Sequence, residues 1–146
     1  MSASLAHWKP VKKNVWDYRE VPDDPSVNEL MPGFEIQYMI TEDTVPDNDK
    51  AVFGHCIFPP KSGHDKHRHT EAAEIMYIIR GKLVVGYTTP EGDVEEVCTP
   101  GKAAFIPAGV VCWCRNPFEE EVEFVFAYFG CNSLEASGYI GGHGAE

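Results

Sequence analysis

Short apolar runs separated by turn-forming residues most constrain how this chain can fold. The runs are rich in β-branched and aromatic side chains, and Gly, Pro, Asn and Asp fill the intervals between them. They occupy residues 34–41, 51–58, 74–79, 82–89, 94–98, 103–106, 110–114 and 122–129. Runs of this length and composition predict strands. Eight strands at this spacing, without a helical period between them, predict one all-β sandwich or barrel.

The runs divide the 146 residues into three parts, and this length suits a single domain. Residues 1–33 show neither a strand nor a helix period, and they predict an extended arm that packs on the barrel or on a partner subunit. Residues 34–132 form the predicted barrel, in which the run 122–129 is apolar on both faces and predicts a central strand. The glycine-rich residues 133–146 predict a flexible C-terminal tail.

The charge balance and the cysteines narrow the classes of partner and compartment. Twelve Lys and Arg stand against 23 Asp and Glu, which gives a formal net charge of -11. Such a chain repels nucleic-acid phosphates and anionic membrane surfaces, so we expect neither as a partner. No run reaches the roughly 20 apolar residues that span a bilayer, and no secretion signal is found. Five cysteines, an odd number, predict reduced thiols in a cytoplasmic protein.

Histidines and carboxylates gather in the stretch HDKHRHTEAAE, residues 64–74. His67 and His69 are two positions apart, so in extended backbone their side chains leave the same face. Glu74 follows after a short connection that can return its carboxylate beside them. Two histidines and one carboxylate are the ligand set of non-haem Fe(II) oxygenases, and this set also suits Zn, Mn, Ni or Co. The alternative is a solvated polar turn; we predict one divalent transition metal, because charge beside a buried strand needs compensation.

Two motifs in register resemble those of a known family. HRHTEAAEIMYIIRG (67–81) follows the spacing histidine, one residue, histidine, four residues, glutamate, six residues, glycine. GKAAFIPAGVVCWCRN (101–116) matches the second motif of the same family. Over roughly residues 50–130 the chain resembles the small single-domain cupins. This resemblance implies a jelly-roll fold and a homodimer, and it implies dioxygenases as a common outcome beside lyases, isomerases, decarboxylases and cyclases.

Two positions depart from the cupin pattern. Lys61 stands where cupins usually carry a glycine, so we expect the loop that enters the site to take a different path. Cys112 stands where they usually carry the last metal-binding histidine. A thiolate there would be a soft ligand, whereas a neutral buried thiol would leave three ligands and one more open position. We favour a three-residue site with Cys112 in or beside the ligand shell.

Strand alternation assigns further side chains to the site. Counted from Glu74, the side chains of Met76 and Ile78 point inward, and Cys114 shares the face of Cys112. This largely apolar lining predicts a small organic substrate.

The sequence pattern also predicts the roles of the remaining histidines. His55 lies in an apolar run, where it is either a core histidine satisfied by hydrogen bonds or a proton carrier at the cavity wall; as the second it is the candidate catalytic residue. His64 and Glu71 do not keep the period of the metal ligands, so we expect them in a solvated loop. His143 falls in the predicted tail.

The function that these features predict is that of a metal-dependent cupin enzyme acting on a small organic molecule. Non-haem Fe(II) dioxygenation is the first expectation, because the ligand set matches it. A redox-neutral lyase, isomerase or cyclase is the alternative. A ligand-binding cupin without turnover is the expectation from a different class, and the fold does not choose among them.

Overall fold

The computed structural model describes residues 13–25 and 31–142 of the chain. Within these ranges, the 3-10 helix η1 (Tyr18–Glu20) precedes ten strands. The strands are β1 (Glu35–Ile40), β2 (Ala51–Phe58), β3 (Ser62–His69), β4 (Ala73–Arg80), β5 (Leu83–Thr89), β6 (Gly92–Cys98), β7 (Ala103–Ile106), β8 (Cys112–Asn116), β9 (Val122–Phe129) and β10 (Tyr139–Gly141). None of the helices in these ranges has the length and apolar character needed to cross a membrane.

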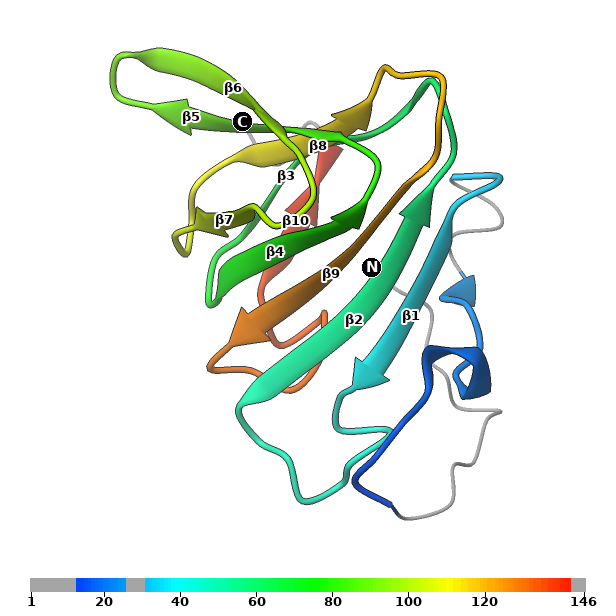
Figure 1. Cartoon of the computed structure of the whole chain (residues 1–146). Helices are drawn as coiled ribbons and strands as arrows, with labels where there is room; N and C mark the ends of the chain where they lie inside the picture. The colour runs from blue at the N-terminus through cyan, green and yellow to red at the C-terminus, as the bar shows by residue number, and fades with distance from the viewer. Residues whose placement is uncertain (1–12, 26–30, 143–146) are drawn as a thin grey trace.

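The strands form two five-stranded sheets that pack face to face (Figure 1). The first sheet has the order β1-β2-β9-β4-β7, and the second has the order β10-β3-β8-β5-β6. All neighbours within each sheet are antiparallel. The predicted all-β jelly-roll sandwich is confirmed. The prediction of a central strand over 122–129 is confirmed as well, because β9 lies between β2 and β4.

Alternation along β9 shows how the space between the sheets is filled. Phe124, Phe126 and Tyr128 are buried on its inward face, while the residues between them are more exposed. The ring of Phe126 lies directly over Gly54 of β2, where a Cβ atom would come within 2.2 Å of the ring. Position 54 therefore has to be a glycine for the aromatic layer to pack at this density.

All eight predicted runs form strands, with ends that differ by a few residues. β3 and β10 were not among the strands predicted from the sequence. β3 reads SGHDKHRH, so it lacks the apolar alternation by which strands are recognised, although its inward face is buried at His67 and His69. β10 has three residues and is held by its pairing with β3 rather than by its own composition.

The two ends of the described chain both contact the sandwich. In the predicted arm, the ring of Tyr18 stacks on His55 of β2 at 3.9 Å, and Val21 is buried; Trp8 lies outside the described residues. In the predicted tail, the structure differs from the expectation, because residues 139–141 extend the second sheet and Ser137 is fully buried. His143 lies outside the described residues.

Candidate metal centre

Three strands bring the predicted ligands together between the sheets. β3 carries His67 and His69 on its inward face, its neighbour β8 carries Cys112, and β4 of the opposite sheet carries Glu74. His67 and Cys112 are register partners. The donor atoms of His67, Glu74 and Cys112 lie within 4.8 Å of one another, and all three residues are buried. His69 joins the group through Glu74, with 3.7 Å between Nε2 and Oε1.

The backbone fixes the tautomer of His67. Its Nδ1 lies 2.8 Å from the carbonyl oxygen of Asp65. A carbonyl oxygen can only accept, so Nδ1 carries the hydrogen and Nε2 carries the lone pair. That Nε2 lies 3.5 Å from the Cys112 sulfur. His67 therefore presents a nitrogen lone pair to the centre of the group, where the Cys112 thiol can donate to it.

A serine fixes the tautomer of His69 in the same way. The His69 Nδ1 lies 2.8 Å from the Ser137 hydroxyl oxygen, and this hydroxyl donates its own hydrogen to the carbonyl of Leu134. The serine oxygen therefore accepts from Nδ1–H, and Nε2 of His69 is left with its lone pair. Orientation of a metal-binding histidine through its second nitrogen is the usual supporting arrangement at metal sites.

Two buried polar atoms then face each other without a hydrogen bond between them. His69 Nε2 and Glu74 Oε1 have no hydrogen-bond partner within the described parts of the chain. Their separation of 3.7 Å is too long for a hydrogen bond. Buried polar atoms without partners are costly and rare in folded proteins. A divalent cation bound here would satisfy both atoms, and the nitrogen, oxygen and sulfur donors around it are those of transition-metal sites.

The protonation states agree with a site for a cation. Burial raises the pKa of Glu74 to about 8. Burial, with a smaller effect of the neighbouring His67 ring, lowers the pKa of His69 to about 3, and burial also lowers the pKa of His67. The imidazoles are thus neutral, as metal ligands must be, and the carboxylate lacks the positive partner that would keep it ionised.

Cys112 is buried beside the imidazole of His67. Burial, followed by the charge of Glu74, raises the pKa of this thiol. A thiol in such a setting stays protonated unless a metal displaces its proton. The structure therefore places Cys112 next to the ligands, where it can act either as a fourth donor or as a neutral wall.

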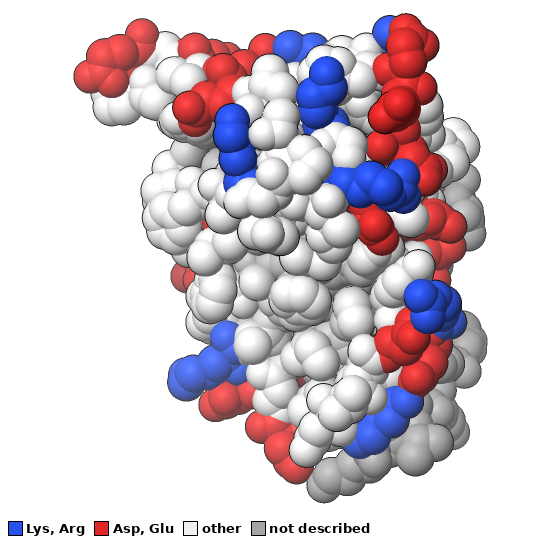
Figure 2. All heavy atoms as spheres, in the orientation of Figure 1, with Lys and Arg blue, Asp and Glu red and all other residues white. Residues whose placement is uncertain are grey.

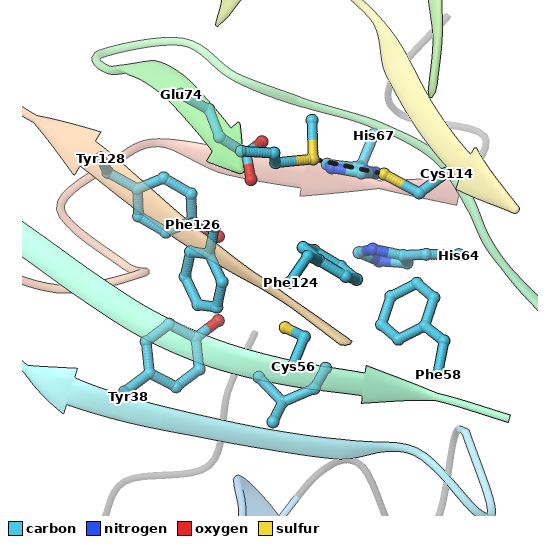
Figure 3. Close-up of a pocket in the computed structure, with 12 residues that line it drawn as sticks. Tyr38, Cys56, Phe58, His64, His67, Glu74, Cys114, Phe124, Phe126 and Tyr128 are labelled. Atoms are coloured by element: carbon cyan, nitrogen blue, oxygen red, sulfur yellow. Dashed lines mark hydrogen bonds between the residues drawn. The ribbon is translucent and has the colours of Figure 1, made fainter. Parts of the chain in front are cut away.

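A cavity opens from this group toward the first sheet (Figure 3). His67 and Glu74 lie on one side of it, and aromatic side chains of β1, β2 and β9 line the side toward the first sheet (Figure 3). Its lining consists of Ile36, Tyr38, Cys56, Phe58, His64, His67, Glu74, Met76, Cys114, Phe124, Phe126 and Tyr128. The inward positions expected for Met76, Ile78 and Cys114 are confirmed, and Ile78 is buried just beyond the cavity.

Two predicted histidine positions need correction. His64 was expected in a solvated loop, but it lies in β3 with its ring stacked on His67 at 4.2 Å, and it lines the cavity. Burial, with smaller effects of His67 and His69, lowers the pKa of His64 to about 3. Glu71 is exposed in the β3–β4 turn, as expected.

His55 lies on the outer face of β2, away from the cavity that its neighbour Cys56 lines. Its Nδ1 lies 2.9 Å from Gln37 Oε1, and its Nε2 lies 2.7 Å from Glu123 Oε2. These contacts match the other role predicted for His55, that of a core histidine satisfied by hydrogen bonds. The assignment of His55 as a proton carrier at the cavity wall is therefore corrected.

Sequence reasoning missed Ser137 and underrated two tyrosines. Ser137 stands 68 positions after the histidine that it orients, in a stretch without strand signals, so nothing in the spacing pointed to it. Tyr38 and Tyr128 line the cavity, and neither is among the site residues predicted from the sequence. The inward register of β9, counted from its apolar alternation, was the available signal for Tyr128.

The family described as "Cupin domain" matches residues 54–128. A search of curated proteins finds no match.

Solved structures share the fold at low sequence identity. A variant of oxalate decarboxylase from Bacillus subtilis is similar with a TM-score of 0.73 and 18% identity, over 88% of this chain and 32% of that chain. An oxalate oxidase gives 0.61 and 19%, over 74% and 54%, and Peruvianin-I, a cysteine peptidase from Thevetia peruviana latex, gives 0.67 and 13%, over 80% and 71%. The chain thus spans about a third of the oxalate decarboxylase that it matches. With its family match over half of its length and this jelly-roll architecture, the chain belongs to the cupin family.

Proposed function

We propose that this cupin is an enzyme that uses one divalent transition metal to act on a small organic molecule. His67, His69 and Glu74 would hold the metal, with Cys112 beside them. The observation that supports this most directly is that the buried atoms His69 Nε2 and Glu74 Oε1 face each other at 3.7 Å, and neither has a hydrogen-bond partner among the described residues. A cation between them would convert an uncompensated cost of burial into two coordination bonds.

The residues of the chain give the site its remaining properties. When bound, such an ion supplies Lewis acidity or activates O₂. The Asp65 carbonyl and the Ser137 hydroxyl hold the imidazoles in the tautomer that a metal needs. The aromatic side chains of Phe58 and Phe124 line the cavity, and such apolar walls strengthen polar interactions inside it.

Within this class, non-haem Fe(II) dioxygenation is our first assignment, because two imidazoles and one carboxylate are its ligand set. A redox-neutral lyase, isomerase or cyclase is the second assignment. It is favoured by the hydroxyls of Tyr38 and Tyr128 in the same cavity, since such a reaction needs groups that move protons. O₂ consumption with iron-loaded protein and a panel of small substrates separates the two: product without O₂ uptake supports the second.

Metal analysis tests the proposal itself. We expect protein purified without chelators to carry close to one transition-metal ion per chain, and we expect Glu74→Gln to lose it. Glu71→Gln is the matched control, because this carboxylate is exposed in the turn three residues earlier. A wild-type protein that binds none of Fe, Mn, Zn, Ni and Co after reconstitution would overturn the proposal and favour a ligand-binding cupin.

Cys112→Ser then decides the role of the thiol. We expect this variant to keep its ion, because three ligands remain and the thiol is neutral in its buried setting. Loss of the ion from Cys112→Ser, with Cys114→Ser unchanged, would instead make Cys112 a fourth ligand.

We also propose that two copies of the chain associate through the outer face of the first sheet and that the protein is cytoplasmic. Figure 2 shows mostly uncharged side chains over the centre of this face, with charged ones gathered toward its margins. The exposed large apolar side chains of this face are Phe53, Tyr77, Ile79, Phe105 and Phe129. All five cysteines are free and buried, which suits a reducing compartment.

A further inference from the structure

A row of polar side chains crosses the outer face of the first sheet, away from the metal ligands. Gln37 of β1 and His55 of β2 are register partners, and both are buried. The row continues through Glu123 of β9 to Arg80 of β4, which are register partners as well. At its other end, Gln37 donates a hydrogen bond from Nε2 to Asp23 of the N-terminal arm. The row therefore links four neighbouring strands to the arm.

The arm lies against this row. Its helix η1 lies beside β1 (Figure 1). The ring of Tyr18 stacks on the ring of His55 at 3.9 Å, with 17° between the two planes, and Val21 is buried. The arm thus covers His55, and Asp23 anchors it through the Gln37 amide.

Hydrogen-bond directions place two hydrogens on the His55 ring. Gln37 uses its NH₂ group on Asp23, so its Oε1 faces His55 Nδ1, at 2.9 Å. An amide oxygen only accepts, so Nδ1 carries a hydrogen. His55 Nε2 lies 2.7 Å from Glu123 Oε2, and the other oxygen of this carboxylate lies 3.7 Å from Arg80 Nε. A carboxylate beside a guanidinium accepts, so Nε2 also carries a hydrogen and the ring is an imidazolium.

The neighbouring charges compensate this buried cation. Glu123 contacts the ring directly, and Asp23 contacts it through Gln37. Glu35 lies on the same outer face of β1 as Gln37. The charged side chains of η1 and its flanks pair with one another, Asp17 with Arg19 and Lys13 with Glu20. Two carboxylates therefore offset the cost of burying the imidazolium.

Loss of one proton from His55 to the solvent would reverse the Gln37 amide. The neutral ring keeps the hydrogen on Nε2, because the Glu123 carboxylate only accepts, and its Nδ1 becomes an acceptor. Gln37 meets that acceptor only by turning its NH₂ group toward Nδ1, which turns its oxygen toward the Asp23 carboxylate. Two acceptors then face each other, so the hydrogen bond that anchors the arm is lost.

We propose that His55 and Gln37 form a pH-controlled latch for the N-terminal arm. The protonated imidazole holds the arm on the first sheet. Loss of its proton as the pH rises releases Asp23 and weakens the stacking with Tyr18. The latch then uncovers the outer face of β1 and β2. It lies outside the metal centre, so it does not depend on the proposed function.

NMR spectroscopy of the full chain tests the charge of His55. We expect two N–H signals from this buried ring at pH 6 and one at pH 9, with His55→Gln identifying the signals. Cross-peaks between the rings of Tyr18 and His55 should weaken over the same range. A single N–H signal at pH 6, or two at both pH values, would overturn the proposal.

Trypsin cleavage after Arg19 measures how firmly the arm is docked. The cleavage rate of a free peptide of residues 13–25 at the same pH serves as the reference, which removes the pH dependence of trypsin itself. We expect the protection of the wild-type chain to fall about tenfold between pH 6 and pH 9, the effect of one charge-assisted hydrogen bond. Protection that stays constant over this range would rule out the latch.

Asp23→Asn separates the latch from a general effect of pH on stability. An asparagine amide can accept from the Gln37 NH₂ group or donate to the Gln37 oxygen, so it pairs with both orientations. We expect this variant to keep at pH 9 most of the protection that wild type loses. Asp43→Asn, which changes an exposed carboxylate between β1 and β2, should behave as wild type. Equal losses in Asp23→Asn and wild type would overturn the role of Gln37.

Discussion

At the scale of single residues, the site depends on where a few hydrogen atoms sit. His67 and His69 each donate through Nδ1, one to a backbone carbonyl and one to a hydroxyl, so both Nε2 atoms keep a lone pair that can bind a metal. The opposite tautomer at either residue would place a hydrogen where a metal has to bind. Residues that touch no metal therefore decide whether the ligands can coordinate it.

Ser137→Ala tests this dependence. Loss of the hydroxyl leaves His69 Nδ1–H without its acceptor, so the imidazole loses its preferred orientation and tautomer. We expect the affinity for the metal to fall about 10- to 100-fold, as for other second-layer partners of metal ligands. Competition with a chromophoric chelator measures it.

Ser62→Ala is the control for Ser137→Ala. Ser62 lies on β3, the same strand as His69. Its hydroxyl donates to the carbonyl of Pro59 at 2.6 Å and does not contact the metal ligands. Equal metal affinity of Ser137→Ala and wild type would show that His69 is not oriented by this bond.

Lys61 carries a backbone cost at the turn that enters β3. Its φ is 57°, in the left-handed region where a Cβ atom is unfavourable. Cupins usually have a glycine at this position, so the lysine adopts a backbone conformation that a glycine adopts without strain. Its side chain offsets part of the cost by donating to the carbonyl of Pro117 and pairing with Glu119.

We expect Lys61→Gly to be more stable than Lys61→Ala by about 1 kcal/mol. Both variants keep the positive φ, but only alanine has a Cβ atom that is strained there. Both variants lose the same side-chain contacts, so their difference isolates the backbone. Chemical denaturation measures the free energies of unfolding. An alanine variant as stable as the glycine variant would mean that the backbone carries no strain.

At the scale of strands, apolar alternation predicted most of the fold but missed β3 and β10, two of the strands that serve the site. β3 is polar because its inward face carries ligands instead of core side chains, so the signal that reveals other strands is missing. In β2, alternation puts His55 on the same face as Phe53 and Ile57. Both faces of this strand are apolar, so the sequence does not show which face points inward. Tertiary contacts made that choice: Phe126 packs on one face of β2 and Tyr18 on the other.

A polar cluster ties together three strands of the second sheet. Glu95 of β6 accepts two hydrogen bonds from Arg115 and one from Trp113, both on β8. The strand between them contributes Gly86, which gives the Trp113 ring room to cross. The bonds from Arg115 and then Trp113 lower the pKa of Glu95 from 4.5 to about 2.

The sign of the resulting pH effect follows from this depressed pKa. The cluster contributes stability above pH 4.5, and the contribution is lost as the pH falls toward about 2. We expect Glu95→Gln to be less stable than wild type at pH 7, by less than about 1 kcal/mol because the pair is exposed. Urea denaturation should show this difference shrinking between pH 4.5 and the acid limit.

Glu91→Gln provides the comparison at the neighbouring β5–β6 turn, since this side chain is exposed. A difference between wild type and Glu95→Gln that stays constant with pH would show that ionisation of Glu95 does not contribute.

At the scale of the whole molecule, the distribution of charge leaves one face suited to self-association. Across the first sheet, Phe53, Ala127, Ile75 and Phe105 are register neighbours and form an apolar row. Two chains of net charge -11 repel each other, so a contact between them has to keep acidic groups apart. Contact through an uncharged sheet face with charges at its margins keeps the acidic groups of the two chains apart.

Phe105→Glu tests this contact. Phe105 is 61% exposed, so its replacement should not disturb the core. We expect wild type to have the mass of two chains by light scattering at micromolar concentration and the variant to have the mass of one, because the contact would bury one new carboxylate from each chain.

Val97→Glu makes a comparable change on β6 of the other sheet, where the side chain is 48% exposed. It should leave the mass of two chains unchanged. A wild-type protein that is monomeric at this concentration would contradict association through this face.

The bond between His69 and Ser137 also has a consequence for biosynthesis. The serine is translated 68 residues after the histidine, so a ribosome has made both motifs of the nascent chain before this support exists. An ion captured during translation would meet an imidazole free to rotate and to exchange its proton between the two nitrogens. For the proposed metal, we therefore expect tight loading to follow the arrival of β10 beside β3.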